Sequence, residues 1–123
     1  MNLLKILLAE DDPMNQLLIR KVVGDAGFKL DVVENGQIAI DKLQEQDYDL
    51  ILMDVEMPVM NGYEATSYIR EHLGLKSNIP IIMVTNVNGS YEAAKCMLLG
   101  ANTYLAKPFK SEQLLEEIAT LVI

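Results

Sequence analysis

The stretch Tyr48–Ala65, YDLILMDVEMPVMNGYEA, gives the clearest indication of the fold of this chain. It begins with an unbroken apolar run, LILM, which is typical of a strand covered on both faces. The run ends on Asp54. A second acid, Glu56, follows two residues later, and Pro58 and Gly62 then turn the chain. A carboxylate at the end of a buried strand is unfavourable unless a positive charge compensates it. The stretch therefore predicts a charged site beside a sheet.

Four more short apolar runs flank this stretch and predict further strands. They are ILLA from Ile6, LDVV from Leu30, IIMV from Ile81 and TYLA from Thr103. The segments between the runs carry apolar residues four positions apart, which predicts helices with one buried face. The predicted faces are Met14, Leu18, Val22 and Ala26; Ala65, Ile69 and Leu73; and Leu114 and Ile118. The alternation of strands and helices predicts a parallel sheet wrapped by helices.

Residues at the predicted helix ends support this pattern. Asp12 and Pro13 predict a capping side chain followed by proline in the first helical position. Gly27 and Gly100 follow helical segments, at the positions where glycine commonly ends a helix. The chain shows no linker or repeat, so we expect a single domain over residues 1–123. Its last residues, TLVI, lack a cap or a polar tail, which is typical of a piece cut from a longer protein.

Length and composition limit the class of protein. A chain of 123 residues, half of them hydrophobic, is long enough for one domain with a buried core. Its apolar runs are far shorter than the roughly 20 residues that cross a bilayer. Its start, MNLLKILLAE, lacks the features of a signal peptide. The single cysteine, Cys96, fits a reducing cytosol. The sequence therefore predicts a cytoplasmic domain without membrane insertion.

Acidic residues gather where the predicted strands end. The net charge of −8 argues against direct binding to nucleic acid, which requires clusters of lysine and arginine. In an open parallel sheet, functional side chains meet outside the carboxyl ends of the strands. The residues at these ends are Glu10, Asp11 and Asp12, then Asp54 and Glu56, then Thr85 and Asn86, and finally Lys107. Crowded carboxylates repel each other and Mg²⁺ binds such oxygens, so the pattern predicts a magnesium site beside a lysine.

Four motifs in this order resemble the receiver domain of bacterial two-component response regulators. They are LLAED, LMDVEMPVMNG, MVT and YLAKPF, and the resemblance spans essentially the whole chain. The segments EDDPMNQ and MDVEMPVMNGYEAT are most similar to receivers attached to hybrid histidine kinases. The resemblance implies a flavodoxin-like α/β fold, in which five βα units form a doubly wound parallel sheet with strand order 2-1-3-4-5.

The resemblance also implies a role for individual residues. Asp54 corresponds to the aspartate that accepts a phosphoryl group, Thr85 to the hydroxyl residue of the family, and Lys107 to its lysine. Tyr104 corresponds to the aromatic switch position, although the residue alone is equally typical of a partly buried strand aromatic. Pro108 corresponds to a proline whose preceding peptide bond is usually cis.

The acidic pair of the family corresponds to Glu10 and Asp11. The resemblance implies that Mg²⁺ is held by Asp11, Asp54 and the backbone carbonyl of Glu56, with Glu10 acting through water. We expect Asp54 to be ionised because the metal and Lys107 favour its charged form.

The same resemblance implies the partners. The phosphoryl donor is expected to be a sensor histidine kinase or a histidine phosphotransfer protein. The signal is expected to pass to an output domain or protein partner through the face made by the fourth helix, fifth strand and fifth helix. Such a domain catalyses only its own phosphorylation and dephosphorylation, so we do not expect an enzyme in the usual sense.

Three single residues complete the sequence predictions. Asn86 stands where the family usually has a small residue, so we expect an altered rate of phosphorylation or lifetime of the product. The branched Val87 predicts modest rather than fast self-hydrolysis. His72 is the only histidine, and we expect it to face solvent without a role in phosphotransfer.

Three other functions remain open from the sequence. A receiver that docks a partner independently of phosphorylation would have the same fold, and Asn86 in place of a small residue leaves this alternative open. A phosphatase with an aspartate nucleophile is suggested by DVE, but that family carries its motif on an early strand. A flavodoxin-like mononucleotide binder would need a Ser-, Thr- or Gly-rich loop after the first strand, whereas EDDP would repel phosphate.

Overall fold

The computed structural model describes residues 4–122, so the ends of the predicted 1–123 domain, Met1–Leu3 and Ile123, lie outside the described residues. Five parallel strands form one sheet in the order β2-β1-β3-β4-β5, which confirms the predicted topology. The strands are β1 Lys5–Ala9, β2 Lys29–Val33, β3 Leu50–Asp54, β4 Ile81–Thr85 and β5 Thr103–Ala106. Each predicted apolar run lies within one of these strands.

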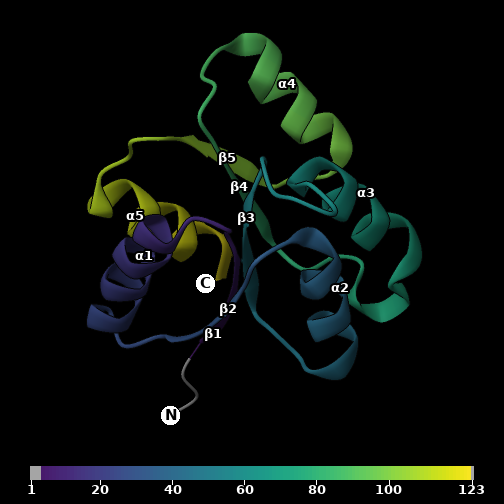
Figure 1. Ribbon diagram of the computed structural model, residues 1–123, viewed down its shortest axis with the longest axis horizontal. Helices are drawn as coiled ribbons and strands as arrows, with labels where there is room; N and C mark the ends of the chain where they lie inside the picture. The colour runs from purple at the N-terminus through teal and green to yellow at the C-terminus, as the bar shows by residue number, and fades with distance from the viewer. Residues whose placement is uncertain (1–3, 123) are drawn as a thin grey trace.

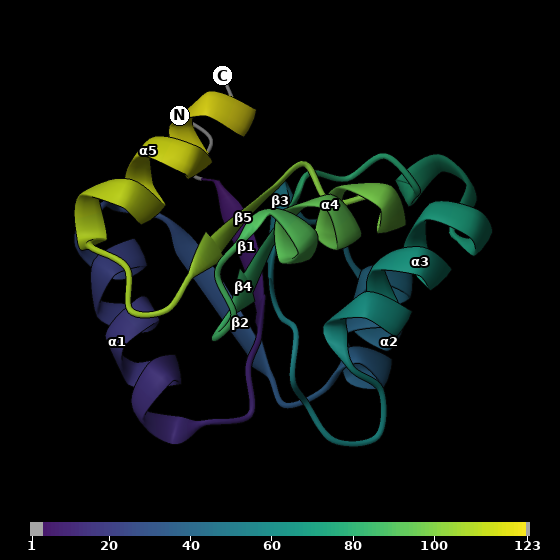
Figure 2. The same ribbon diagram turned by 90° about the horizontal axis from the view of Figure 1, so that it is seen from above.

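Helices cover both faces of the sheet (Figure 1). They are α1 Pro13–Asp25, α2 Gly36–Glu45, α3 Gly62–His72, α4 Ser90–Leu99 and α5 Ser111–Val122, with a 3₁₀ turn, η1, at Gly74–Lys76. Figures 1 and 2 show α1 and α5 on one side of the sheet and α2 and α3 on the other. No helix within residues 4–122 is long and apolar enough to cross a membrane.

The sheet separates two hydrophobic clusters. Leu7 of β1 and Ile51 of β3 pack with α2, α3 and Cys96 of α4, whereas Ile6 and Leu8 of β1 pack with α1 and α5. Successive side chains of a strand point to opposite faces, so a strand covered on both faces must be apolar at every position. This explains why β1, β3 and β4 read as unbroken apolar runs.

The predicted buried face of α1 is wrong by a rotation of the helix. The prediction placed Met14, Leu18, Val22 and Ala26 toward the core. Met14 is 71% exposed, Leu18 is 55% exposed and Ala26 is exposed, and of the four only Val22 is partly buried against the core. The helix buries Ile19 and Val23 instead. Both residues belong to the hydrophobic cluster between the sheet, α1 and α5, and the Gln16 side chain also donates a hydrogen bond to the Glu10 backbone carbonyl at 2.6 Å.

The predicted faces of α3 and α5 and most of the helix ends are confirmed. Ala65 and Ile69 of α3 and the two predicted α5 residues, Leu114 and Ile118, are buried, while Leu73 is only partly buried. The Asp12 side chain accepts a hydrogen bond from the Met14 N–H at 3.4 Å and caps α1. Gly100 ends α4 with a φ of 114°. Gly27, with a φ of 88°, directly follows Ala26, the residue that ends α1.

Candidate functional site

The predicted site residues meet at the carboxyl edge of the sheet. Asp54 and Thr85 are the last residues of β3 and β4, Glu10 and Asp11 follow β1, and Lys107 follows β5. All five line one cavity of about 770 Å³. Glu56 and Asn86 line the same cavity. The strand order brings these residues together because β1 and β4 both lie next to β3.

Lys107 bridges two buried carboxylates. Its Nζ atom lies 2.9 Å from Glu10 Oε1 and 3.2 Å from Asp54 Oδ1. The side chains of Glu10 and Asp54 are 1% and 6% exposed, so these ion pairs are largely shielded from water. The Lys107 backbone N–H donates to the Thr85 carbonyl at 2.7 Å, which anchors the lysine to the end of β4. The peptide bond between Lys107 and Pro108 is cis, as predicted.

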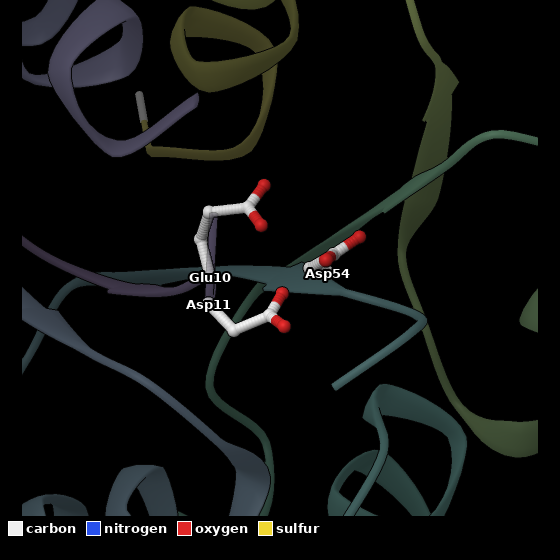
Figure 3. A group of neighbouring side chains, drawn as sticks. All are labelled: Glu10, Asp11 and Asp54. Carbon is white, nitrogen blue, oxygen red and sulfur yellow. The ribbon is translucent and has the colours of Figure 1, made fainter. Parts of the chain in front are cut away.

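Three carboxylates form a group that can bind a cation. Glu10, Asp11 and Asp54 each offer an oxygen, and these oxygens lie within 4.8 Å of one another. Figure 3 shows the three side chains gathered at the ends of two neighbouring strands. Asp11 is exposed whereas the other two are buried, so the group is open to solvent on the Asp11 side. An all-oxygen set of this kind suits a hard divalent cation.

Burial dominates the electrostatics of Asp54. The pKa of Asp54 is raised to about 7, because burial and the charge of Glu10 raise it by more than the positive charge of Lys107 lowers it. Burial by itself would lower the pKa of Lys107, but Glu10 and Asp54 raise it above its ordinary value. Lys107 therefore stays charged but leaves Asp54 only partly ionised near neutral pH, so the full ionisation expected of Asp54 depends on a further cation.

The loop after Asp54 is held close to the end of β3. The Gly62 N–H donates to the Val55 carbonyl at 2.9 Å. A Cβ atom on Gly62 would lie 2.2 Å from the Asp54 carbonyl oxygen, so only glycine fits this position. Asn61 and Glu64 then form a capping box that starts α3. These contacts fix the path of the loop that carries Glu56 along the cavity.

The β4–α4 loop forms the opposite side of the cavity. Thr85 is buried, and its Oγ1 atom accepts a hydrogen bond from the Val87 N–H at 3.0 Å. Asn86 and Val87 are exposed at the mouth. Tyr104 is half-buried on β5 and its hydroxyl donates to Asn88 Oδ1 at 3.3 Å. Tyr104 is not among the residues that line the site cavity, so its switch role stays a prediction.

Five residues that line the cavity were missed by the sequence predictions: Asn15 in the first turn of α1, Val55, Met57 and Asn61 in the loop after β3, and Tyr63 directly after Gly62. Their only signal in the sequence is that they lie a few residues beyond a predicted site residue. His72 is exposed and stacks on Tyr68, as expected of a histidine without a role in the site.

Residues 6–119 match the family model described as the response regulator receiver domain. The chain belongs to this family. The match covers every site residue named above and all five strands except Lys5, the first residue of β1. The receiver recognised in the sequence is thereby confirmed.

Curated relatives of this receiver fall into two groups. Hybrid signal transduction histidine kinase G of Dictyostelium discoideum is 38% identical over 113 residues, which cover 90% of this chain but 3% of the kinase. Sensor protein GacS of Pseudomonas syringae is 34% identical over 93% of this chain and 13% of its own length. The chain thus spans a small part of these kinases. Chemotaxis protein CheY of Halobacterium salinarum is 31% identical, and 96% of each chain is covered.

Solved structures show the same fold. The receiver domain of sensor histidine kinase PA1611 from Pseudomonas aeruginosa is 36% identical, with a TM-score of 0.89 and 98% of each chain covered. That domain is described with a magnesium ion coordinated in its active-site cleft. A response regulator from Chloroflexus aurantiacus is 26% identical, with a TM-score of 0.93 and 98% of each chain covered.

Proposed function

We propose that this receiver takes a phosphoryl group onto Asp54 from a histidine kinase or a histidine phosphotransfer protein, in a Mg²⁺-dependent reaction. The observation that carries the proposal is the position of Asp54. Its buried carboxylate lies 3.2 Å from Lys107 and belongs to a group of three acids that can bind a cation. Relatives that are histidine kinases support a kinase as the donor.

The residues present fit magnesium. Asp11 and Asp54 would hold the ion directly, together with the backbone carbonyl of Glu56, and Glu10 would act through water. When bound, the ion neutralises the repulsion between Asp54 and the anionic phosphoryl group. The magnesium ion described in the PA1611 receiver supports this choice of metal.

The side chains supply the rest of the chemistry. An oxygen of Asp54 attacks phosphorus, the P–N bond of the donor phosphohistidine breaks, and the imidazole leaves with the bonding electron pair. Lys107 pairs with an equatorial phosphoryl oxygen, and the Thr85 hydroxyl donates a hydrogen bond to another. The product is a mixed anhydride of Asp54, which hydrolyses and so gives a temporary signal.

The phosphorylated domain would act on a protein rather than on a substrate. We propose that its α4-β5-α5 face, including Tyr104, changes conformation and controls an output domain or protein partner. The net charge of −8 supports a protein partner over direct nucleic-acid binding. The domain turns over no substrate besides its own phosphoryl group. The single cysteine fits the reducing cytoplasm, where we expect this reaction to take place.

Mass spectrometry tests the proposal. The intact protein is incubated with acetyl phosphate and Mg²⁺, beside the variant Asp54→Asn and a sample with chelator in place of the metal. We expect one phosphoryl adduct on the wild type with metal and none in the other two samples. A wild type that takes up no phosphoryl group would contradict the proposal and favour phosphorylation-independent docking. Steady hydrolysis of p-nitrophenyl phosphate would favour a phosphatase.

A further inference from the structure

A third buried carboxylate lies outside the site, on α4. Glu10, Asp54 and Glu92 are the buried acidic residues within residues 4–122, and Glu92 is 6% exposed. Lys107 pairs with the first two, whereas no salt bridge in this part of the chain involves Glu92. A buried carboxylate without hydrogen-bond partners is strongly unfavourable, so the partners of Glu92 matter for how α4 is held.

Tyr63 of α3 is the hydroxyl partner of this carboxylate. Its hydroxyl donates a hydrogen bond to Glu92 Oε1, and the Cys96 thiol lies 3.8 Å from the same oxygen. Lys95 Nζ lies 4.0 Å from the centroid of the Tyr63 ring, within reach of a cation–π interaction. Burial and the nearby carboxylate raise the pKa of Tyr63, so its hydroxyl keeps the proton that it donates. The contact joins α3 to α4, which lie side by side (Figure 1).

Tyr63 is also tied to the phosphoacceptor site. It directly follows Gly62, whose N–H donates to the Val55 carbonyl and whose Cα packs against the Asp54 backbone. Tyr63 lines the site cavity as well. The start of α3 is therefore packed against the backbone of Asp54, and the Tyr63 hydroxyl links this end of α3 to α4.

The helix α4 has few other anchors at its N-terminal end, whereas at its C-terminal end Arg70 of α3 donates to the carbonyl of the cap residue Gly100 at 2.8 Å. Its buried residues are Glu92 and Cys96. Its cap residue, Gly89, provides no side-chain hydrogen bond, and residues 86–90 are exposed. A hydrogen bond to a charged group is stronger than one between neutral groups. The Tyr63–Glu92 hydrogen bond therefore helps to fix the N-terminal half of α4, beside the packing of this helix on β5.

We propose that Tyr63 and Glu92 form a clasp that holds α4 in the arrangement of this structure, against the movement that phosphorylation of Asp54 favours. The inference rests on the proposed function and adds two positioning residues to it. In this arrangement Thr85 Oγ1 accepts from the Val87 N–H, and Lys107 is shared between two carboxylates. A phosphoryl group on Asp54 would draw both side chains toward itself and displace the loop that leads into α4.

The clasp predicts a linkage between α4 and the site. If the clasp holds the arrangement that the phosphoryl group disfavours, weakening it raises the population of the competing arrangement. A ligand that prefers this competing arrangement then binds more tightly, by the same factor. Beryllium fluoride with Mg²⁺, which mimics a phosphoryl group on a carboxylate, is a suitable probe.

The variant Tyr63→Phe removes one hydroxyl and leaves the ring in place. Its matched control is Tyr68→Phe, the same change on the same helix at a partly exposed residue whose hydroxyl has no hydrogen-bond partner within residues 4–122. We expect Tyr63→Phe to bind beryllium fluoride about fivefold more tightly than the wild type. The control should bind it with the affinity of the wild type. NMR signals of the backbone amides of residues 86–89 measure both affinities. Hydrogen exchange of the α4 amides should be faster in ligand-free Tyr63→Phe than in the control.

A second variant separates the clasp from a general loss of stability. Glu92→Gln removes the charge, and combining it with Tyr63→Phe should change the affinity no further than Tyr63→Phe alone. Unchanged or weaker affinity in Tyr63→Phe, or additive effects in the double variant, would overturn the clasp. A wild type that binds no beryllium fluoride would instead overturn the proposed function, and with it the regulatory role of the clasp.

Discussion

Asp54 is a buried acid whose nearest cation does not fully compensate it. Its pKa is about 7 because burial and the charge of Glu10 outweigh Lys107. The ordinary pKa of the group is 3.8, so between about pH 4 and pH 7 the folded chain binds a proton that the unfolded chain releases. The free energy of unfolding therefore falls as the pH rises through this range, in the absence of metal.

The variant Asp54→Asn should remove this pH dependence. In chelator-treated protein we expect it to unfold at higher urea concentration than the wild type at pH 7.5, by about 1–2 kcal/mol after allowance for solvent screening. The difference should shrink as the pH falls toward 4 and vanish near pH 3, where the carboxyl is largely protonated in both the folded and the unfolded state. Urea titrations at several pH values measure it. A constant difference between the two proteins from pH 4 to pH 8 would contradict the raised pKa.

Lys107 stabilises the fold as well as the site. The variant Lys107→Met leaves Glu10 and Asp54 buried together without their cation, which should lower the free energy of unfolding by about 2–3 kcal/mol at pH 7.5. Lys110→Met is a matched control, because Lys110 is exposed and forms no salt bridge within residues 4–122. Thermal unfolding followed by circular dichroism compares the two variants. Equal stability would show that the ion pairs contribute nothing.

The β3–α3 loop contains a residue in an unfavourable backbone conformation. Val59 has a φ of 68° and is 83% exposed. The Met60 N–H donates to the Pro58 carbonyl at 2.7 Å, so Pro58, Val59 and Met60 form a turn of only three residues with Val59 at its centre. Positive φ is rare for a β-branched residue, and no burial of the Val59 side chain offsets its cost.

The variant Val59→Asn should therefore stabilise the domain. Asparagine tolerates the left-handed region, so we expect a gain of about 0.5–1 kcal/mol in the free energy of unfolding. Val87→Asn is the matched control, since Val87 is also exposed but has no positive φ. Chemical denaturation of both variants gives the comparison. A loss of stability in Val59→Asn would mean that the turn does not store strain.

The spacing of apolar residues in a helix does not always determine which of its faces is buried. Spacing by four residues predicted the buried faces of α3 and α5 but not that of α1. In α1 the pairs Leu18–Val22 and Ile19–Val23 have the same spacing, so the pattern does not decide between them. The choice depends on tertiary packing, in which Ile19 and Val23 contact the sheet and α5.

Across the whole domain, the site was predictable because topology determines it. A parallel sheet brings its strand ends to one edge, so acids after β1 and β3 and a lysine after β5 had to meet there. The clasp was not predictable in this way. Tyr63 and Glu92 lie in different helices, and their contact depends on how α3 and α4 pack against each other. The sequence around Glu92, SYEAAKCMLL, carries no sign that its carboxylate is buried.

The proposed function requires that a cation among three carboxylates lets Asp54 carry a phosphoryl group. A crystal structure with Mg²⁺ and beryllium fluoride tests this requirement. We expect beryllium fluoride on the Asp54 carboxylate, a metal ion contacting Asp11 and Asp54, and Lys107 turned to a fluoride. A structure with no beryllium fluoride on Asp54, or with the metal away from these carboxylates, would contradict it.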